Sequence, residues 1–131
     1  MAHYDRFEDL DIYKLSRIQC NDIWKIIIST ELSKDYKLKE QINGSSGSVM
    51  DNIAEGFGRG GNKEFIQFLG YARGSNNETR AQLQRIFDRN YISESLYVEL
   101  YSKSETINEQ ISKFMGYLKL SDRRGSKFDN L

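Results

Sequence analysis

The chain has 131 residues, enough for one domain with a single core, and it contains one cysteine and no proline. Lys and Arg together number 19, as do Asp and Glu, so the chain lacks the basic excess that usually marks a nucleic-acid-binding protein. One cysteine excludes a disulfide within the chain, and no stretch has the roughly 20 apolar residues of a membrane span. The first residues also lack the apolar segment of a signal peptide. We therefore expect a single cytoplasmic domain over residues 1–131, with no membrane partner.

Residues 1–8 are expected to form a short arm, followed by a first helix that begins near Asp9 or Asp11 and ends at about Glu31. The polar residues 29–35 are expected to form the connection to the next helix. The apolar arc of this first helix is wide, which indicates contact with more than one neighbour. Its members are Leu10, Ile12, Tyr13, Leu15, Cys20, Ile23, Trp24, Ile26 and Ile27.

The second segment, residues 37–57, spaces its large apolar side chains as a helix does, but residues 43–48 interrupt it. These six residues read Asn-Gly-Ser-Ser-Gly-Ser, which is typical of a turn or a flexible linker. In a helix, the same small residues would let a neighbouring backbone approach closely. The residues alone leave both interpretations open.

Four glycines at positions 56, 58, 60 and 61 predict a corner between the second and third segments. Glycine adopts the positive φ that a helix end and a tight reversal need. The letters Gly-x-Gly-x-x-Gly over residues 56–61 also fit a dinucleotide-binding pattern. That pattern requires a preceding strand, whereas here a helix is predicted to precede it, so we expect a helix corner and no cofactor site.

A third helix is predicted from about Asn62, its N-cap, to Asn90, and a fourth follows with Ser93 as its cap. The seam of the fourth helix repeats at alternating spacings of four and three, as in a helical bundle. The seam consists of Leu100, Ser104, Ile107, Ile111, Phe114 and Leu118. Residues 121–131 are polar and are expected to form a frayed tail. Four helices joined by short corners predict an all-α, antiparallel, up-down-up-down four-helix bundle.

Catalysis and metal binding have little support in the sequence. The only histidine, His3, lies in the predicted arm, so no Ser-His-Asp or Cys-His group can assemble within the core. A zinc or di-iron site would lack its His and Cys ligands. The sequence therefore predicts no catalytic residue, no cofactor and no metal, and a protein that is not an enzyme.

The corner and the third helix are locally basic although the net charge is zero. Arg59 and Lys63 flank the corner, and Arg73 and Arg80 share one face of the third helix because they are seven residues apart. Since arginine binds phosphate through paired hydrogen bonds, these four side chains are the candidate nucleic-acid-binding residues. The alternative is a solvated face or a subunit interface whose cations pair with nearby carboxylates. Those carboxylates are Glu64, Glu78 and Asp88.

The octet Asn52-Ile53-Ala54-Glu55-Gly56-Phe57-Gly58-Arg59 resembles the signature of a known family. This is the family of four-helix-bundle proteins encoded in intervening sequences of bacterial 23S ribosomal RNA genes, called the S23 or IVS-encoded family. The resemblance covers about Leu10 to Leu118 and implies that residues 43–48 are helical. It includes Leu38-x-x-Gln41-Ile42, Lys63-Glu64-Phe65-x-x-Phe68-Leu69 and Ala72-Arg73-Gly74-Ser75.

Two positions depart from the family pattern. Asn43 and Gly44 stand where a basic pair is usual, which removes positive charge that would support RNA contact. Met50 and Asp51 stand before the octet, where a proline is usual. The first departure weakens an expectation of RNA binding, and the second favours a straighter second helix.

The resemblance implies a bundle that assembles as a ring-shaped homo-oligomer, typically a homopentamer, and it implies no enzymatic activity. It also implies a relationship to the accessory proteins of diversity-generating retroelements, which bind nucleic acid and a reverse transcriptase. The expected function is a non-enzymatic, ring-forming interaction module that contacts RNA or a ribonucleoprotein. The alternative is a protein-binding scaffold without nucleic-acid contact, for example accessory to a reverse transcriptase, and the zero net charge favours it.

Overall fold

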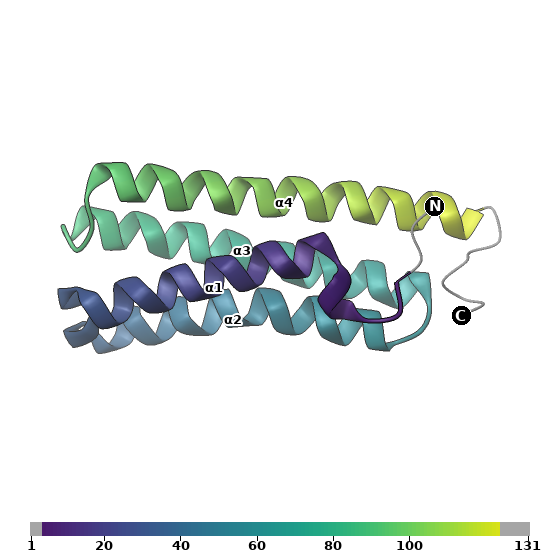
Figure 1. Cartoon of the computed structure of the whole chain (residues 1–131), viewed down its shortest axis with the longest axis horizontal. Helices are drawn as coiled ribbons and strands as arrows, with labels where there is room; N and C mark the ends of the chain where they lie inside the picture. Colours follow the sequence, from purple (N-terminus) through teal and green to yellow (C-terminus); the bar gives the residue numbers. More distant parts are fainter. Residues whose placement is uncertain (1–3, 124–131) are drawn as a thin grey trace.

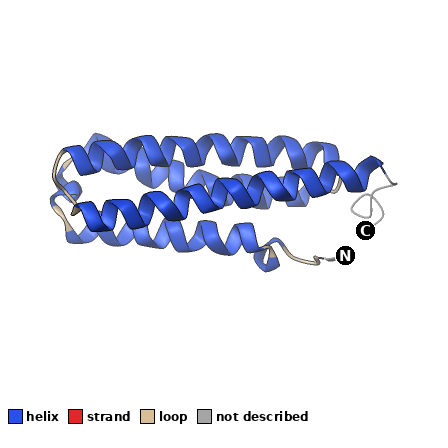
Figure 2. Cartoon of the chain, turned by 90° about the horizontal axis from the view of Figure 1, so that it is seen from above, coloured by secondary structure: helices blue, strands red, loops and turns tan. Residues whose placement is uncertain are grey.

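The structure, a computed structural model, describes residues 4–123, so part of the predicted arm (1–3) and most of the predicted tail (124–131) lie outside the described residues. Within that range there are four long helices and no strand, as Figure 2 shows. None of these helices combines the length and the apolar character that crossing a membrane requires.

The four helices are α1 (Asp11–Ser29), α2 (Tyr36–Gly58), α3 (Asn62–Asp88) and α4 (Glu94–Arg123), and two short 3-10 turns are η1 (Phe7–Asp9) and η2 (Glu31–Lys34). The helices lie alongside one another, and α1 begins at the end of the bundle where α4 ends (Figure 1). Both α1 and α3 pack against α2 and α4. The predicted all-α bundle of four helices is therefore confirmed.

Some helix boundaries differ from the predicted ones. α1 begins at Asp11 with Leu10 as its N-cap and without a side-chain cap, so neither predicted aspartate caps it. α4 has the predicted cap, because the Ser93 hydroxyl accepts a hydrogen bond from the Leu96 amide at 3.1 Å. α4 also continues to Arg123, past the predicted start of the tail.

Asn62 does not cap α3, although its position suggested it. The N-cap of α3 is Gly61, and no side chain bonds the first turn there. Asn62 is 1% exposed, and its Nδ2 donates a hydrogen bond to the carbonyl of Leu118 in α4 at 3.0 Å. The amide therefore joins two helices, because a buried polar group needs a partner and α4 provides one.

Residues 43–48 are a regular part of α2, as the family resemblance implied. The buried hydroxyl of Ser46 donates back to the carbonyl of Ile42 at 2.8 Å. The buried hydroxyl of Ser45 lies 2.9 Å from the hydroxyl of Thr79 in α3. Because these side chains are small and their hydroxyls are paired, α3 can pack closely on this stretch, and tertiary contact overrides the turn propensity.

The core consists of two apolar clusters, one toward the α2–α3 corner and one toward the opposite end of the bundle. Fully burying one Leu or Ile side chain contributes about 1.5–3 kcal/mol, so these clusters supply most of the favourable free energy of folding. The first cluster includes Leu10, Val49, Ile53, Phe65, Leu69, Ile107, Ile111 and Leu118. The second includes Ile23, Ile27, Leu32, Leu38, Ile42, Leu83, Ile86 and Leu100.

A polar layer centred on Asn76 separates the two clusters. Asn76 is fully buried; its Oδ1 accepts from Gln19 Nε2 of α1 at 2.9 Å and from the Ser104 hydroxyl of α4 at 3.0 Å. Its Nδ2 donates to the Ser104 carbonyl and to Asn108 Oδ1, both at 2.8 Å. One amide thus joins α1, α3 and α4 through hydrogen bonds.

Candidate interaction surfaces

The α2–α3 corner depends on two glycines for different reasons. Gly60 has φ of +89°, a conformation that favours glycine. A Cβ on Gly56 would lie 2.7 Å from Phe68 Cβ and 2.9 Å from Phe65 Cδ1, too close for any side chain. Gly56 therefore lets α3 start in direct contact with the end of α2. This contact fixes the backbone that carries Arg59 and Lys63.

Arg59 and Lys63 differ in how far their charges are balanced. The Arg59 guanidinium lies 3.6 Å from a Glu55 carboxylate oxygen and 3.9 Å from one of Glu64. It also lies over the Phe68 ring, 5.0 Å from the centroid. Lys63 is exposed and forms no ion pair with residues 4–123. Of the two predicted corner cations, Lys63 is therefore the one available to an anionic partner.

Arg73 and Arg80 lie on the face of α3 that meets α4, called here the α3–α4 face, and are held there by neutral groups. Arg73 Nη1 donates to the Ser112 hydroxyl of α4 at 3.0 Å. Arg80 donates to Asn77 Oδ1 and lies over the Tyr101 ring of α4, 5.7 Å from the centroid. Neither guanidinium forms an ion pair with residues 4–123, so both keep an unbalanced positive charge and free N–H donors.

Of the three carboxylates expected to pair with cations of the basic face, only one does so among the described residues. Glu64 pairs with Arg59. Glu78 and Asp88 form no ion pair within the described part of the chain. The cations on the α3–α4 side are therefore not cancelled by the carboxylates that share their helix.

The four predicted cations do not form one continuous surface. A helix turns 100° per residue, so Lys63 lies about 80° around α3 from Arg73. Arg59 covers Phe68, and Phe68 lies about 140° around α3 from Arg73. Arg73 and Arg80 share the face toward α4, as their spacing predicts. The structure thus brings together two of the four, with Lys63 at the edge and Arg59 on another side.

Three residues of α4 belong to this α3–α4 face and are missing from the set predicted from sequence. Tyr101 lies under Arg80, Ser112 accepts from Arg73, and Asn108 donates to Asn77 Oδ1 at 2.8 Å. Arg73 and Arg80 are seven residues apart, as are Tyr101 and Asn108, which is the repeat expected of helices that pair along a seam. That shared spacing is the signal that could have located them.

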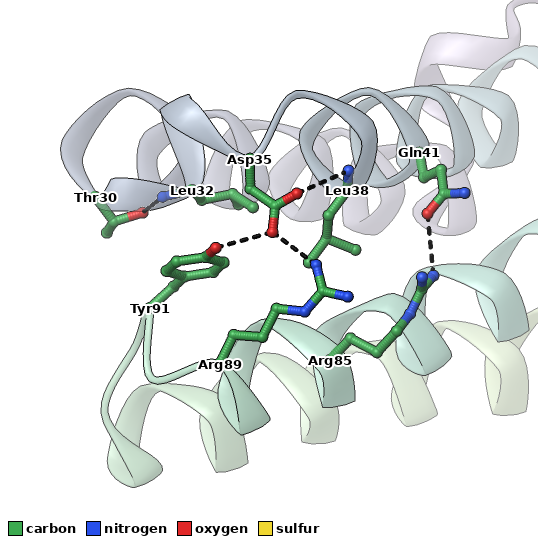
Figure 3. Close-up of polar contacts among 8 residues, drawn as sticks. All are labelled: Thr30, Leu32, Asp35, Leu38, Gln41, Arg85, Arg89 and Tyr91. Carbon is green, nitrogen blue, oxygen red and sulfur yellow. Dashed lines mark hydrogen bonds and ion pairs between the residues drawn. The ribbon is translucent and has the colours of Figure 1, made fainter.

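A second polar cluster, centred on Asp35, lies at the opposite end of the bundle (Figure 3). One oxygen of Asp35 accepts from Arg89 Nη1 at 2.7 Å and from the Tyr91 hydroxyl at 2.8 Å. The other caps α2 by accepting from the Leu38 amide at 3.4 Å. Nearby, Arg85 of α3 donates to Gln41 of α2 at 3.1 Å, so polar contacts continue along this helix pair.

These contacts change the proton affinity of both acidic groups. The Tyr91 hydroxyl, and then Arg89, lower the pKa of Asp35. The hydrogen bond to Asp35 raises the pKa of Tyr91. A carboxylate with a lowered pKa is a weaker base, so the cluster is suited to joining the α1–α2 connection to the α3–α4 corner rather than to proton transfer. Among residues 4–123, no three His, Cys, Asp or Glu side chains gather as a metal site would require.

Comparison with known proteins identifies relatives of this chain. It resembles a solved structure of a protein of unknown function from the S23 ribosomal protein family of Bacteroides thetaiotaomicron VPI-5482, at 23% identity and a TM-score of 0.72. That match covers 79% of this chain and 97% of the other, and it supports the fold. Among curated proteins no match was found. The family described as 23S rRNA-intervening sequence protein matches residues 8–113. Since this is well over half of the sequence, the chain belongs to the 23S rRNA-intervening sequence protein family.

Proposed function

We propose that this protein is a non-enzymatic, ring-forming interaction module that contacts RNA, alone or in a ribonucleoprotein, through the α3–α4 face. Arg73 and Arg80 would contact phosphates, with Lys63 at the edge of the same surface. The ring is a homo-oligomer, with a pentamer favoured by the family resemblance.

The observation that supports RNA binding is the pair of guanidinium groups held by neutral partners. Arg73 is positioned by a serine hydroxyl, and Arg80 by an amide oxygen and an aromatic ring. Such groups are oriented without losing their charge, which is what contact with a phosphate requires. An arginine bound by two carboxylates, as Arg59 is, would first have to give up those partners.

A protein-binding scaffold, for example one accessory to a reverse transcriptase, is the second candidate. The observation that favours it is the balance of 19 basic and 19 acidic residues, because nucleic-acid-binding domains usually carry a basic excess. In this case the same α3–α4 face would bind an acidic or polar surface of a protein.

The test is fluorescence anisotropy with a labelled fragment of 23S ribosomal RNA at two salt concentrations. The variant Arg73→Ala/Arg80→Ala should bind more weakly. The slope of its log binding constant against log salt concentration should be shallower by roughly 0.7–0.9 for each lost phosphate contact. The control variant Arg6→Ala/Lys34→Ala also removes two positive charges, but from exposed side chains that pair with Glu8 and Glu31.

Binding that falls in the Arg73→Ala/Arg80→Ala variant alone supports phosphate contact through the α3–α4 face. Equal losses in both variants would mean that only total charge matters, and the assignment to the α3–α4 face would be wrong. If the wild type does not bind at low salt, the proposed RNA binding is wrong, and the protein-binding scaffold becomes the function to test with protein partners.

A further inference from the structure

The outward face of α1 carries large apolar side chains that nothing in the described chain covers. Ile18 is 50% exposed, Trp24 is 51% exposed and Ile28 is 61% exposed. Trp24 was expected in the apolar arc of this helix, but it lies at the edge of the arc and is half in solvent. Trp24 and Ile28 border a shallow groove of about 190 Å³ between α1 and α2. Three such residues on one helix face are typical of an interaction site.

The same face of α1 is positively charged. Lys14, Arg17 and Lys25 are exposed and lie within about 120° of arc together with the three apolar residues. None of them forms an ion pair with residues 4–123. Of the two acidic residues on the helix, Asp22 pairs with Lys103 of α4 at 3.2 Å, and Asp11 lies in the first turn, three residues before Lys14. The face is therefore both apolar and cationic.

The outward face of α2 has the opposite character. From Glu40 to Gly58 the helix contains three carboxylates and neither lysine nor arginine. Glu40 and Asp51 are exposed and unpaired among residues 4–123, and between them lie Gly44 and Gly47. Apart from its chain neighbours and the backbone of its own helix, no described atom lies within 4 Å of the place where a Cβ on either glycine would be. Each glycine in a helix costs roughly 0.8–1 kcal/mol relative to alanine, and no contact within the chain offsets that cost.

We infer that the α1 face of one copy packs against the α2 face of a second copy. Trp24 and Ile28 of one copy would cover Gly44 and Gly47 of the next, where the absence of side chains lets a helix approach closely. The cations of α1 would lie opposite the carboxylates of α2, so the two faces are complementary in charge as well as in shape.

When each copy uses its α1 face on one neighbour and its α2 face on another, the contact is heterologous, and it forms a ring if the rotation between copies closes. The inference rests on the proposed function, of which ring formation is a part. It deepens that proposal by naming the two faces that meet and by leaving the α3–α4 face outside the contact.

Charge reversal tests this pairing, with mass measured by light scattering after size-exclusion chromatography. Arg17→Glu/Lys25→Glu should reduce the mass of the assembly to that of one chain, 15.3 kDa. Glu40→Lys/Asp51→Lys should do the same. The control Lys113→Glu/Lys119→Glu reverses two exposed charges on α4 and should leave the assembly intact. All six positions are on exposed helix surface, so each variant is expected to fold, and circular dichroism checks this.

Rescue makes the test specific. An equimolar mixture of the two reversed variants should assemble again, since the new carboxylates of one match the new lysines of the other. The two variants must alternate around such an assembly, so a ring with an odd number of subunits, such as a pentamer, cannot close from the mixture. The variant with all four reversals should assemble by itself with wild-type mass.

The outcomes separate this inference from the ring proposal. A wild-type protein that stays monomeric at the highest protein concentration measured would overturn both the ring proposal and the pairing of the two faces. A wild-type oligomer whose mass is unchanged by Arg17→Glu/Lys25→Glu would overturn the pairing alone. Dissociation of both double variants, together with a variant carrying all four reversals that stays monomeric, would show that the α1 face contacts a surface other than α2, which also overturns the pairing.

Discussion

The two ends of the bundle are closed by different forces. At the α2–α3 corner, Gly56 lets the aromatic side chains of α3 touch the backbone of α2, and the contact is one of shape. At the other end, Asp35 joins the connections through Arg89 and Tyr91, and the contact is one of charge and hydrogen bonds. The corner should therefore be sensitive to side-chain volume and insensitive to pH. The opposite end should show the reverse.

Gly56→Ala should have the largest effect, because the new methyl group would lie 2.7 Å from Phe68 Cβ. Overpacking of this kind costs about 1–3 kcal/mol, and the helix propensity of alanine recovers at most about 1 kcal/mol of it. Urea unfolding followed by circular dichroism measures the loss. A variant as stable as the wild type would show that the corner can relax, and that shape does not hold this end.

Asp35→Asn should have a smaller effect, and one that depends on pH. Asparagine keeps only one of the two oxygens, so the change removes the charge and also one of the hydrogen bonds from Tyr91 and the Leu38 amide, which Asp35 accepts on different oxygens. The folded-state pKa of Asp35 is lowered, so its charge stabilises the fold above the pKa of the unfolded chain, near 3.9. That contribution is lost as the pH falls through the lower, folded pKa.

The wild type should therefore be more stable than the Asp35→Asn variant at pH 7, and the difference should shrink as the pH falls below about 4. Thermal unfolding across this range measures it. Glu31→Gln is the control, since Glu31 pairs with Lys34 between two largely exposed side chains and should contribute little. A difference between Asp35→Asn and wild type that is constant with pH would mean that the charge is not what holds this end.

Gly44→Ala should have the smallest effect on folding, and with the opposite sign to Gly56→Ala. Gly44 has no neighbour within 4 Å of a new methyl group, so the substitution should stabilise the folded chain by about 0.5–1 kcal/mol. Urea unfolding of dilute protein checks the sign. The same change should weaken self-association if the α2 face packs against a second copy. If Gly44→Ala destabilises the folded chain, Gly44 is needed for the conformation of α2 itself and not for the close approach of a helix from a second copy.

Periodic features of the sequence predicted the fold well. The alternating spacing of Leu100, Ile107, Ile111 and Leu118 identified α4, and these residues are buried. Residues 43–48 were ambiguous, because their propensity for turns is a local property. Their helical state depends on Thr79 of α3, a contact that local propensity does not contain.

The candidate surface was less predictable than the fold. Arg73 and Arg80 were correctly placed on one face, but Tyr101 and Ser112 come from a second helix whose alignment with α3 is set by packing. The exposure of Trp24 was missed, since helical spacing does not show where a wide apolar arc ends. Both gaps concern which surfaces meet, and that information lies in pairs of helices.

The polar layer around Asn76 also determines how the helices are aligned along the bundle axis. Sliding one helix by a single turn, about 5.4 Å, would move Asn76 away from Gln19 or Ser104 and place amides among leucine and isoleucine. Each buried polar group left without a partner costs about 1–3 kcal/mol. Apolar clusters alone tolerate such sliding, because one leucine replaces another at similar free energy. The layer therefore makes every shifted alignment costly and leaves one register in which the outward faces of α1 and α2 and the α3–α4 face are correctly assembled.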